Sequence, residues 1–158
     1  MVIEHISALC QLWAGTGITF IYCNYKEPQT TTTYMRLALK QLCRTMQSLP
    51  SGLHRVYEQQ YKNDSQPRYD ELRSTFLTII QSLGCIFFVV DALDECTLEG
   101  RKKLCQSLMS ITDITSTSTG QGTVKFFVTS RKESDIEQAF QQKAIPTIQI
   151  EATKSIAI

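Results

Sequence analysis

Residues 86–95 of the chain read Ile-Phe-Phe-Val-Val-Asp-Ala-Leu-Asp-Glu, a run of strand-forming apolar residues that leads into three carboxylates. Because no polar residue interrupts the apolar run, it predicts a strand that is buried on both faces, as in a parallel sheet packed between helices. Ligands of open α/β sheets bind at the carboxyl ends of such strands. We therefore expect Asp91, Asp94 and Glu95 to lie at a ligand-binding edge of the sheet.

The three acids allow a functional and a structural interpretation. In nucleotide triphosphatases, one aspartate holds a hydrated magnesium ion and a nearby acid orients a water molecule. On this interpretation the segment is a Walker B strand and Asp91 is its metal residue. The structural alternative is that Asp91 only caps the following turn and that the other acids are solvated. The additional acids at 94 and 95 favour the metal site.

A second apolar strand pattern begins at Lys125 and ends in Thr129, Ser130 and Arg131. An arginine at this position can reach the terminal phosphate of a nucleotide held beside the acids of a neighbouring strand. The alternative is structural, because Ser130 and Glu133 match the S-x-x-E capping box of a following helix. Capping explains Ser130 and Glu133 but not Arg131. We therefore predict that Arg131 senses phosphate, on the condition that the acidic strand is a metal site.

The remaining apolar periodicity alternates between helix and strand. Helices are predicted at 2–13, 32–47, 53–61, 69–83, 98–110 and 131–141, and strands at 18–22, in the acidic segment, at 124–129 and at 143–150. A polar loop is predicted at 115–123, and the low-complexity stretch 112–119 is predicted to be surface loop. Strands and helices alternate as in βαβ units, so we expect an α/β fold with a mostly parallel sheet and helices on both faces.

The composition of the chain is that of one ordinary globular domain. It has 158 residues, of which 42% are apolar and 20% charged, with a net charge of +1 and no dense basic stripe. These values give no support to nucleic-acid or anionic-membrane binding. The longest apolar run, 85–90, is too short to span a bilayer, and Glu4 and His5 lie where a signal peptide needs an apolar core. We expect an intracellular, cytoplasmic protein.

Cysteines lie at positions 10, 23, 43, 85, 96 and 105, with no C-x-x-C motif and no histidine at metal-site spacing. Four of them fall in apolar stretches, where a reduced thiol acts as a small hydrophobic group. Cys96 follows the acidic cluster, and acidic neighbours raise the pKa of a thiol. We therefore expect the cysteines to be structural and Cys96 to be unreactive.

Taken together, the strand segments resemble the NACHT domain, in the version found in fungal NACHT-ankyrin and nephrocystin-like proteins. The matching segments are Phe-Phe-Val-Val-Asp-Ala-Leu-Asp-Glu-Cys at 87–96, Lys-Phe-Phe-Val-Thr-Ser-Arg-Lys-Glu-Ser-Asp-Ile at 125–136, and a further strand and loop at 18–30. The resemblance covers essentially the whole chain. It implies a three-layer, P-loop NTPase-like sheet and a signalling switch of the STAND class, in which nucleotide state controls self-association.

The resemblance also implies roles for individual residues. By position, Asp91 would bind magnesium through water, while Asp94 and Glu95 would be the catalytic acids that polarise water or support that metal. Arg131 would be the sensor that contacts the bound nucleotide. The implied cofactors of the intact family are Mg²⁺ and ATP or GTP. The implied partners are a second copy or other protein domains, such as the ankyrin or similar repeats of the full-length family, and neither nucleic acid nor membrane.

One family motif is missing, because no G-x-x-x-x-G-K-S/T occurs in the sequence. The resemblance therefore implies that residues 1–158 form a partial NACHT domain, truncated just after the Walker A loop. On this reading the sheet lacks the P-loop strand, and the C-terminal helical and repeat regions are absent. We expect that the chain alone neither binds nor hydrolyses ATP or GTP. A truncated gene model and a degenerate paralogue would both account for the missing motif.

Three functional classes stay open. The first is the partial nucleotide switch, and the second is a protein-interaction or scaffold module that uses the same fold without nucleotide. The third is an independent magnesium-dependent phosphohydrolase, which fares worst because Asp91 and Asp94 are three positions apart, whereas haloacid-dehalogenase-type enzymes need two aspartates two apart. Dinucleotide binding is disfavoured as well, since no G-x-G-x-x-G follows a strand.

Overall fold

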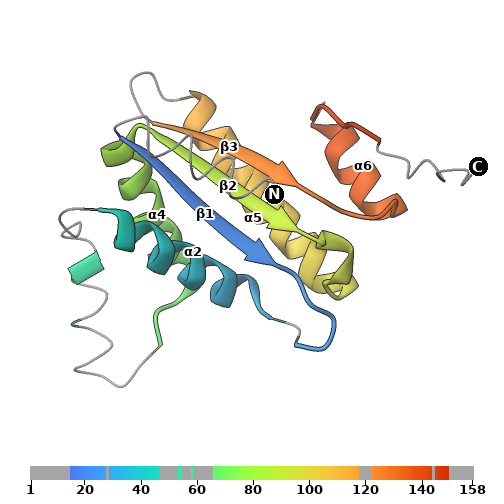
Figure 1. The fold of residues 1–158 in the computed structure, drawn as a ribbon, viewed down its shortest axis with the longest axis horizontal. Helices are drawn as coiled ribbons and strands as arrows, with labels where there is room; N and C mark the ends of the chain where they lie inside the picture. The colour runs from blue at the N-terminus through green and yellow to red at the C-terminus, as the bar shows by residue number, and fades with distance from the viewer. Residues whose placement is uncertain are drawn as a thin grey trace, which may run out of the picture.

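The computed structural model describes residues 15–27, 29–46, 53–54, 58, 66–117, 122–143 and 145–149. Its strands β1 (Thr16–Tyr22), β2 (Cys85–Asp91) and β3 (Thr123–Val128) form a parallel sheet in the order β1-β2-β3. The acidic strand β2 lies in the centre of this sheet (Figure 1). The prediction of an α/β fold with a parallel sheet is confirmed.

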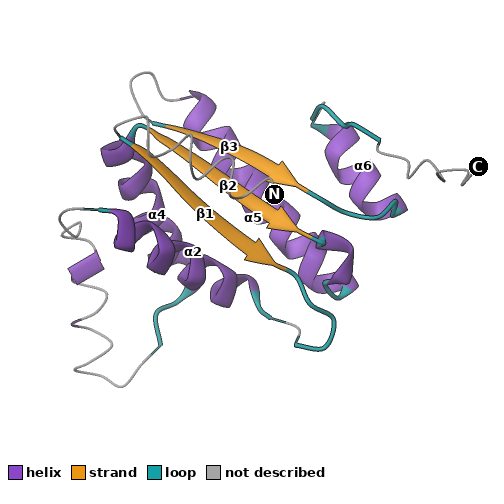
Figure 2. Cartoon of the chain, viewed as in Figure 1, coloured by secondary structure: helices purple, strands orange, loops and turns teal. Residues whose placement is uncertain are grey.

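Of the four described α-helices, three lie between the strands in the chain, together with one short turn, and the fourth follows the last strand (Figure 2). The helices are α2 (Thr31–Thr45), α4 (Tyr69–Leu83), α5 (Leu98–Thr117) and α6 (Ser134–Gln142), and the 3-10 turn η1 is Leu93–Glu95. Helices α2, α4 and α5 lie behind the sheet in this view, and α6 lies beyond β3. None of the helices in the described part of the chain combines the length and apolarity needed to cross a membrane.

The two faces of the sheet differ in burial. On the covered face, Ile21, Phe88 and Val90 are almost completely buried. On the opposite face, Tyr22 is 56% exposed and Phe127 is 42% exposed. The helix predicted at 2–13 lies outside the described residues. A second layer of helices on this more exposed face therefore stays a prediction.

The sequence signals that define α2 and α4 operate as expected. The side chain of Thr30 accepts a hydrogen bond from the backbone N–H of Thr33 and so caps the start of α2. One face of α2 supplies Met35, Leu39 and Leu42 to the core. Helix α4 spans the predicted residues 69–83 and ends at Gly84, whose φ of 78° is a left-handed conformation suited to glycine.

A glutamine of α2 pairs with backbone groups of β1. The Gln41 side-chain oxygen accepts hydrogen bonds from the Thr19 hydroxyl at 3.0 Å and from the Phe20 N–H at 2.8 Å. Its side-chain nitrogen donates to the Phe20 carbonyl at 2.9 Å. Unpaired backbone groups at the edge of a sheet are open to pairing with other chains. Gln41 therefore shields the edge of β1 and fixes α2 beside it.

The predicted loop after residue 111 is wrong over residues 112–117, which continue α5. Ile111 is fully buried and holds this end of the helix in the core. The polar threonines that suggested a loop bond back to the helix instead: the hydroxyl of Thr112 donates to the Leu108 carbonyl and that of Thr115 to the Ile111 carbonyl, both at 3.1 Å. Such back-bonding lets a threonine-rich segment remain helical.

The strand predicted at 143–150 is not formed over residues 145–149, which have no regular structure and are exposed, with Ile148 at 85%. A strand needs a neighbour to pair with, and residues 145–149 pair with no strand of the described sheet. Helix α6 begins at Ser134, three residues later than predicted. Of the short helix predicted at 53–61, only Leu53, His54 and Glu58 are described, and all three are helical.

Candidate functional site

Strands β2 and β3 end at the same edge of the sheet. Val90 of β2 is in register with Val128 of β3, so Asp91 and Thr129 follow at the same level. The Thr129 hydroxyl donates a hydrogen bond to Oδ1 of Asp91 and accepts one from the Ala92 N–H at 2.9 Å. The Thr129 carbonyl accepts from the Leu93 N–H at 2.9 Å. Thr129 was not predicted as a site residue. It fixes both Asp91, the candidate metal residue, and the start of the loop that carries Asp94 and Glu95, which we call the acidic loop.

The chain turns sharply immediately after Asp91. Ala92 has a φ of 56° and a ψ of 49°, and it is the one residue with positive φ among the described non-glycine residues. A left-handed conformation costs a non-glycine residue about 1–2 kcal/mol. The hydrogen bonds from Ala92 and Leu93 to Thr129 hold it in place. This turn directs η1, with Asp94 and Glu95, toward the end of β3.

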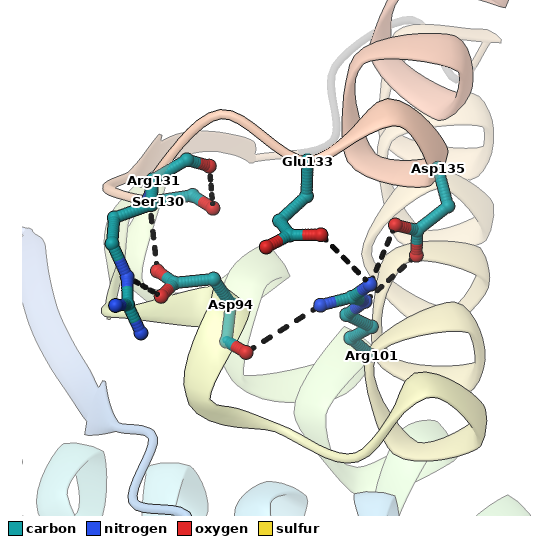
Figure 3. Close-up of polar contacts among 6 residues, drawn as sticks. All are labelled: Asp94, Arg101, Ser130, Arg131, Glu133 and Asp135. Atoms are coloured by element: carbon teal, nitrogen blue, oxygen red, sulfur yellow. Dashed lines mark hydrogen bonds and ion pairs between the residues drawn. The ribbon is translucent and has the colours of Figure 1, made fainter.

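Asp94 and Arg131 form an ion pair across this edge (Figure 3). Nε of Arg131 donates to Oδ2 of Asp94 at 2.6 Å, and the Arg131 backbone N–H donates to Oδ1 at 2.9 Å. The Asp94 side chain is 5% exposed, whereas that of Arg131 is 80% exposed. Burial raises the pKa of Asp94, but the hydrogen bonds from Arg131 outweigh it and bring the pKa below the ordinary value of 3.8. Asp94 is therefore held as an ionised acceptor.

The plain capping explanation for Asp91 is wrong. Turn η1 follows Ala92 and has no side-chain cap, and Asp91 is instead engaged by Thr129. Glu95 is half-buried on the same turn, and its charge contributes to raising the pKa of Arg131, after the larger contribution of Asp94. The structure therefore brings Asp91, Asp94, Glu95 and Arg131 to one edge, as predicted.

The predicted capping box of Ser130 and Glu133 is also wrong. The Ser130 hydroxyl donates to the Arg131 carbonyl at 2.7 Å. Because α6 begins at Ser134, Glu133 precedes the helix, and it makes no side-chain cap there. Its carboxylate lies 3.4 Å from Nη2 of Arg101 instead (Figure 3).

Arg101 joins α5, α6 and the acidic loop. Its Nε and Nη2 donate to the two carboxylate oxygens of Asp135, each at 2.7 Å, and its Nη1 donates to the Asp94 carbonyl at 3.5 Å. The Arg101 side chain is 13% exposed, so this bidentate pair is largely shielded from solvent. No sequence signal predicted the pair of Arg101 and Asp135, because the two residues are 34 positions apart.

The edge fits one mode of magnesium binding. Oδ1 of Asp91 is engaged by Thr129, and its Oδ2 has no hydrogen-bond partner among the described residues. Mg²⁺ keeps several waters and is usually held by one or two carboxylates together with substrate phosphates. A single free carboxylate oxygen fits that mode. Within the described ranges, no three Cys, His, Asp or Glu side chains gather into a metal-binding cluster.

Asp94 acts to raise the pKa of Cys96, as its acidic neighbours predicted, but the net shift is in the opposite direction. The low reactivity of Cys96 stays a prediction. Cys96 is buried, and its pKa is lowered to about 7. A hydrogen bond with Cys23 is the largest cause, and it acts with Tyr34 and Arg101 against burial and the charge of Asp94. The same contact with Cys96 raises the pKa of Cys23, and burial raises that of Tyr34. These neighbours come from other elements, so adjacent sequence could not identify them.

A parallel α/β sheet whose central strand delivers acids to its carboxyl edge has a layout like that of P-loop proteins. The chain belongs to the family described as nephrocystin 3, N-terminal, whose sequence model matches residues 1–131. The match includes all three described strands and extends through Arg131. Neither the curated proteins nor the solved structures gave a significant match. The nephrocystin-like resemblance is therefore confirmed.

We expect Asp94→Asn to lower the free energy of unfolding at pH 7 by about 1–3 kcal/mol, because an amide cannot replace the buried charge-assisted acceptor. The folded pKa of Asp94 lies below its unfolded value. The stabilisation that ionised Asp94 gives the folded state is therefore complete above about pH 4. It is lost as the pH falls through the pKa of Asp94 in the folded state. Urea unfolding at pH 7 and pH 3 should show that the free energy of unfolding falls less between these two pH values in the variant than in the unmodified chain. Glu99→Gln, which breaks an exposed pair with Lys103, should change stability by less than about 0.5 kcal/mol; equal effects would contradict the role of Asp94.

We expect Asp91→Asn to change the free energy of unfolding by less than about 0.5 kcal/mol, since the asparagine oxygen still accepts from Thr129 and the repulsion between the acids falls. Thr129→Val should cost about 1–3 kcal/mol, because it removes the partner of Asp91 and of the Ala92 N–H. Thr129→Ser keeps the hydroxyl and is the matched control. Thermal and urea unfolding measure all three. A loss of more than about 2 kcal/mol in Asp91→Asn would make Asp91 a structural residue.

Proposed function

We propose that the chain is the Walker B and sensor part of a nucleotide-dependent signalling switch of the NACHT type. In this proposal, the carboxyl edge of β2 and β3 faces Mg²⁺ and ATP or GTP. Asp91 holds the hydrated ion, and Asp94 and Glu95 orient water or support the ion. The observation that best supports the proposal is the 2.6 Å contact between Asp94 and Arg131, which couples the two strand ends.

The geometry of Arg131 suits a sensor. Its Nε is occupied by Asp94, while its two terminal nitrogens have no hydrogen-bond partner in the part of the chain that the structure describes. A guanidinium is a planar fork that binds carboxylate and phosphate oxygens from its different edges. Asp94 can therefore orient Arg131 and leave its exposed end available to a phosphate. An Mg²⁺ ion held at Asp91 would neutralise part of the negative charge of the phosphates.

The Arg101 cluster offers a route by which the edge could influence other parts of the molecule. Arg101 contacts the Asp94 carbonyl on one side and Asp135 of α6 on the other. A shift of the acidic loop would therefore change the pairing of α6. In a switch, self-association or contact with flanking protein domains would depend on such a shift.

A nucleotide-independent protein-interaction module on the same fold is the alternative. Two observations favour it. Arg131 already donates to both carboxylate oxygens of Asp94, so that acid has its hydrogen bonds without a bound ion or nucleotide. On the more exposed face of the sheet, Tyr22 and Phe127 are partly accessible among the described residues, and aromatic residues are enriched in protein interfaces.

Isothermal titration calorimetry of the 158-residue chain with Mg²⁺ and ATP or GTP tests the nucleotide proposal. P-loop amides and lysine form charge-assisted hydrogen bonds worth about 1.5–3 kcal/mol each, so the absence of three or more weakens binding by roughly three to six orders of magnitude. We expect no saturable heat up to about 1 mM nucleotide. Micromolar affinity would show that this edge binds nucleotide without a phosphate loop and would overturn the assignment of its parts.

A further inference from the structure

The edge of β1 that faces away from β2 carries a side-chain amide where a neighbouring strand would lie. Oε1 of Gln41, on α2, accepts from the Phe20 N–H at 2.8 Å, and Nε2 of Gln41 donates to the Phe20 carbonyl at 2.9 Å. A residue of a paired strand would likewise accept from that N–H and donate to that carbonyl. The amide of Gln41 therefore takes the place of a strand at this one position.

A buried hydroxyl holds Gln41 in this position. Thr19 is 0% exposed, and its hydroxyl donates to Oε1 of Gln41 at 3.0 Å. A buried hydroxyl without a hydrogen bond is costly, so Thr19 and Gln41 each fix the other. Gln41 thus forms three hydrogen bonds with β1, and its orientation is set by the core as well as by the edge.

The rest of this edge has no cover among the described residues. β1 pairs with β2 on its other side, where the Cys23 N–H donates to the Asp91 carbonyl. Backbone groups of alternate residues in a strand point to opposite edges, so those of Ile18 and Tyr22 point outward with those of Phe20. Neither Ile18 nor Tyr22 has a backbone partner on that side in the part of the chain that the structure describes. The edge is therefore a template for strand pairing that Gln41 blocks at its centre.

We propose that this edge is a pairing surface for β1 of a second copy of the chain, and that Gln41 keeps it closed. The segment Thr16–Tyr22 reads Thr-Gly-Ile-Thr-Phe-Ile-Tyr, which is rich in β-branched and aromatic residues and has neither a charge nor a proline. Two copies can therefore pair without like charges facing each other, and nothing on the strand selects a charged partner instead.

The pairing is antiparallel and self-complementary. A twofold axis at Phe20 places Ile18 opposite Tyr22 of the second copy and lets the two Phe20 residues exchange backbone hydrogen bonds. The two three-stranded sheets then become one continuous sheet. Gln41 must leave Phe20 before this can happen, so the position of α2 controls whether the edge is open. The proposal depends on β1 and Gln41 alone, and it holds whether or not the carboxyl edge binds nucleotide.

Size-exclusion chromatography with light scattering of the whole chain, over a range of concentrations, tests the proposal. Gln41→Ala should strengthen self-association by about tenfold or more over the unmodified chain, since hydrogen bonds worth about that factor no longer have to be broken. Gln41→Met keeps the length and helix propensity of glutamine without these bonds, and it should do the same. Gln138→Ala removes an exposed glutamine of α6 and is the matched control, which should leave association unchanged.

A second substitution in the Gln41→Ala chain shows whether β1 forms the interface. Phe20→Lys would place two like charges opposite each other, and Ile18→Pro would remove an outward N–H, so each should return the chain to a monomer. Hydrogen exchange of residues 16–22 in the Gln41→Ala chain should slow as its concentration rises. The proposal is overturned if Gln41→Ala and Gln41→Met fold, as judged by circular dichroism, yet associate no more strongly than the unmodified chain. A dimer that survives both second substitutions would overturn it as well.

Discussion

Replacing Phe88 with alanine should lower the free energy of unfolding by about 3–5 kcal/mol, the range for large aromatic truncations in a core. Phe88 lies in the centre of β2 and is 1% exposed. Its ring packs edge-on against Phe76 of α4 and at a tilt against Phe126 of β3, with centroids 5.8 Å and 5.5 Å apart. Truncation therefore leaves a cavity where the sheet meets its helices. Urea unfolding followed by circular dichroism measures the loss.

Phe127→Ala is the matched control for this prediction. Phe127 lies next to Phe126 on β3 but points to the other face, where it is 42% exposed. Its truncation removes less buried surface and should cost less than about 1 kcal/mol. Equal losses in the two variants would mean that both faces of the sheet are buried to the same degree, contrary to the burial pattern of β3.

Much of the fold followed from local sequence signals. The apolar spacing of α4 predicted its ends, and the uninterrupted apolar run of 86–90 predicted the central strand. The predictions failed where a local signal was overruled by a distant contact. The threonines after Ile111 suggested a loop, but burial of that isoleucine keeps the segment helical. The apolar residues near Ile148 suggested a strand, but residues 145–149 have no described strand to pair with.

For the site, as for the fold, the sequence predicted one part and missed another. Acids and an arginine after neighbouring strands predicted that Asp91, Asp94 and Arg131 would meet at one edge, because the carboxyl ends of parallel strands coincide. The sequence did not predict how these residues are held. Thr129 binds Asp91 across 38 positions, and Arg101 binds Asp135 across 34. Pairings of that separation depend on the assembled fold and leave no periodic pattern in the chain.

The same limit applies to the thiols. Adjacent acids in the sequence indicated a raised pKa for Cys96, and Asp94 does act in that direction. The decisive neighbours are Cys23 and Tyr34, which come from the ends of other elements. Only the packing of β1 and α2 against the acidic loop brings them close.

Supplying a phosphate loop should give the chain magnesium-dependent nucleotide binding. The addition is a strand and a G-x-x-x-x-G-K-S/T loop from a nephrocystin-like relative, fused before residue 1. The loop amides and lysine would restore at least three charge-assisted hydrogen bonds, so affinity for ATP or GTP should rise by roughly three orders of magnitude or more over the unfused chain. A fusion with alanine at the loop lysine is the matched control and should lose most of this gain.

Isothermal titration calorimetry of this fusion, with and without Asp91→Asn and Arg131→Gln, tests whether the edge formed by β2 and β3 binds magnesium and nucleotide. We expect Asp91→Asn to remove most of the magnesium dependence, since it exchanges the metal carboxylate for a neutral amide. We expect Arg131→Gln to weaken binding of the triphosphate more than that of the diphosphate, because the sensor contacts the terminal phosphate. A folded fusion that binds no nucleotide, or that binds it equally well with both substitutions, would contradict the nucleotide switch and leave the protein-interaction module as the function of this fold.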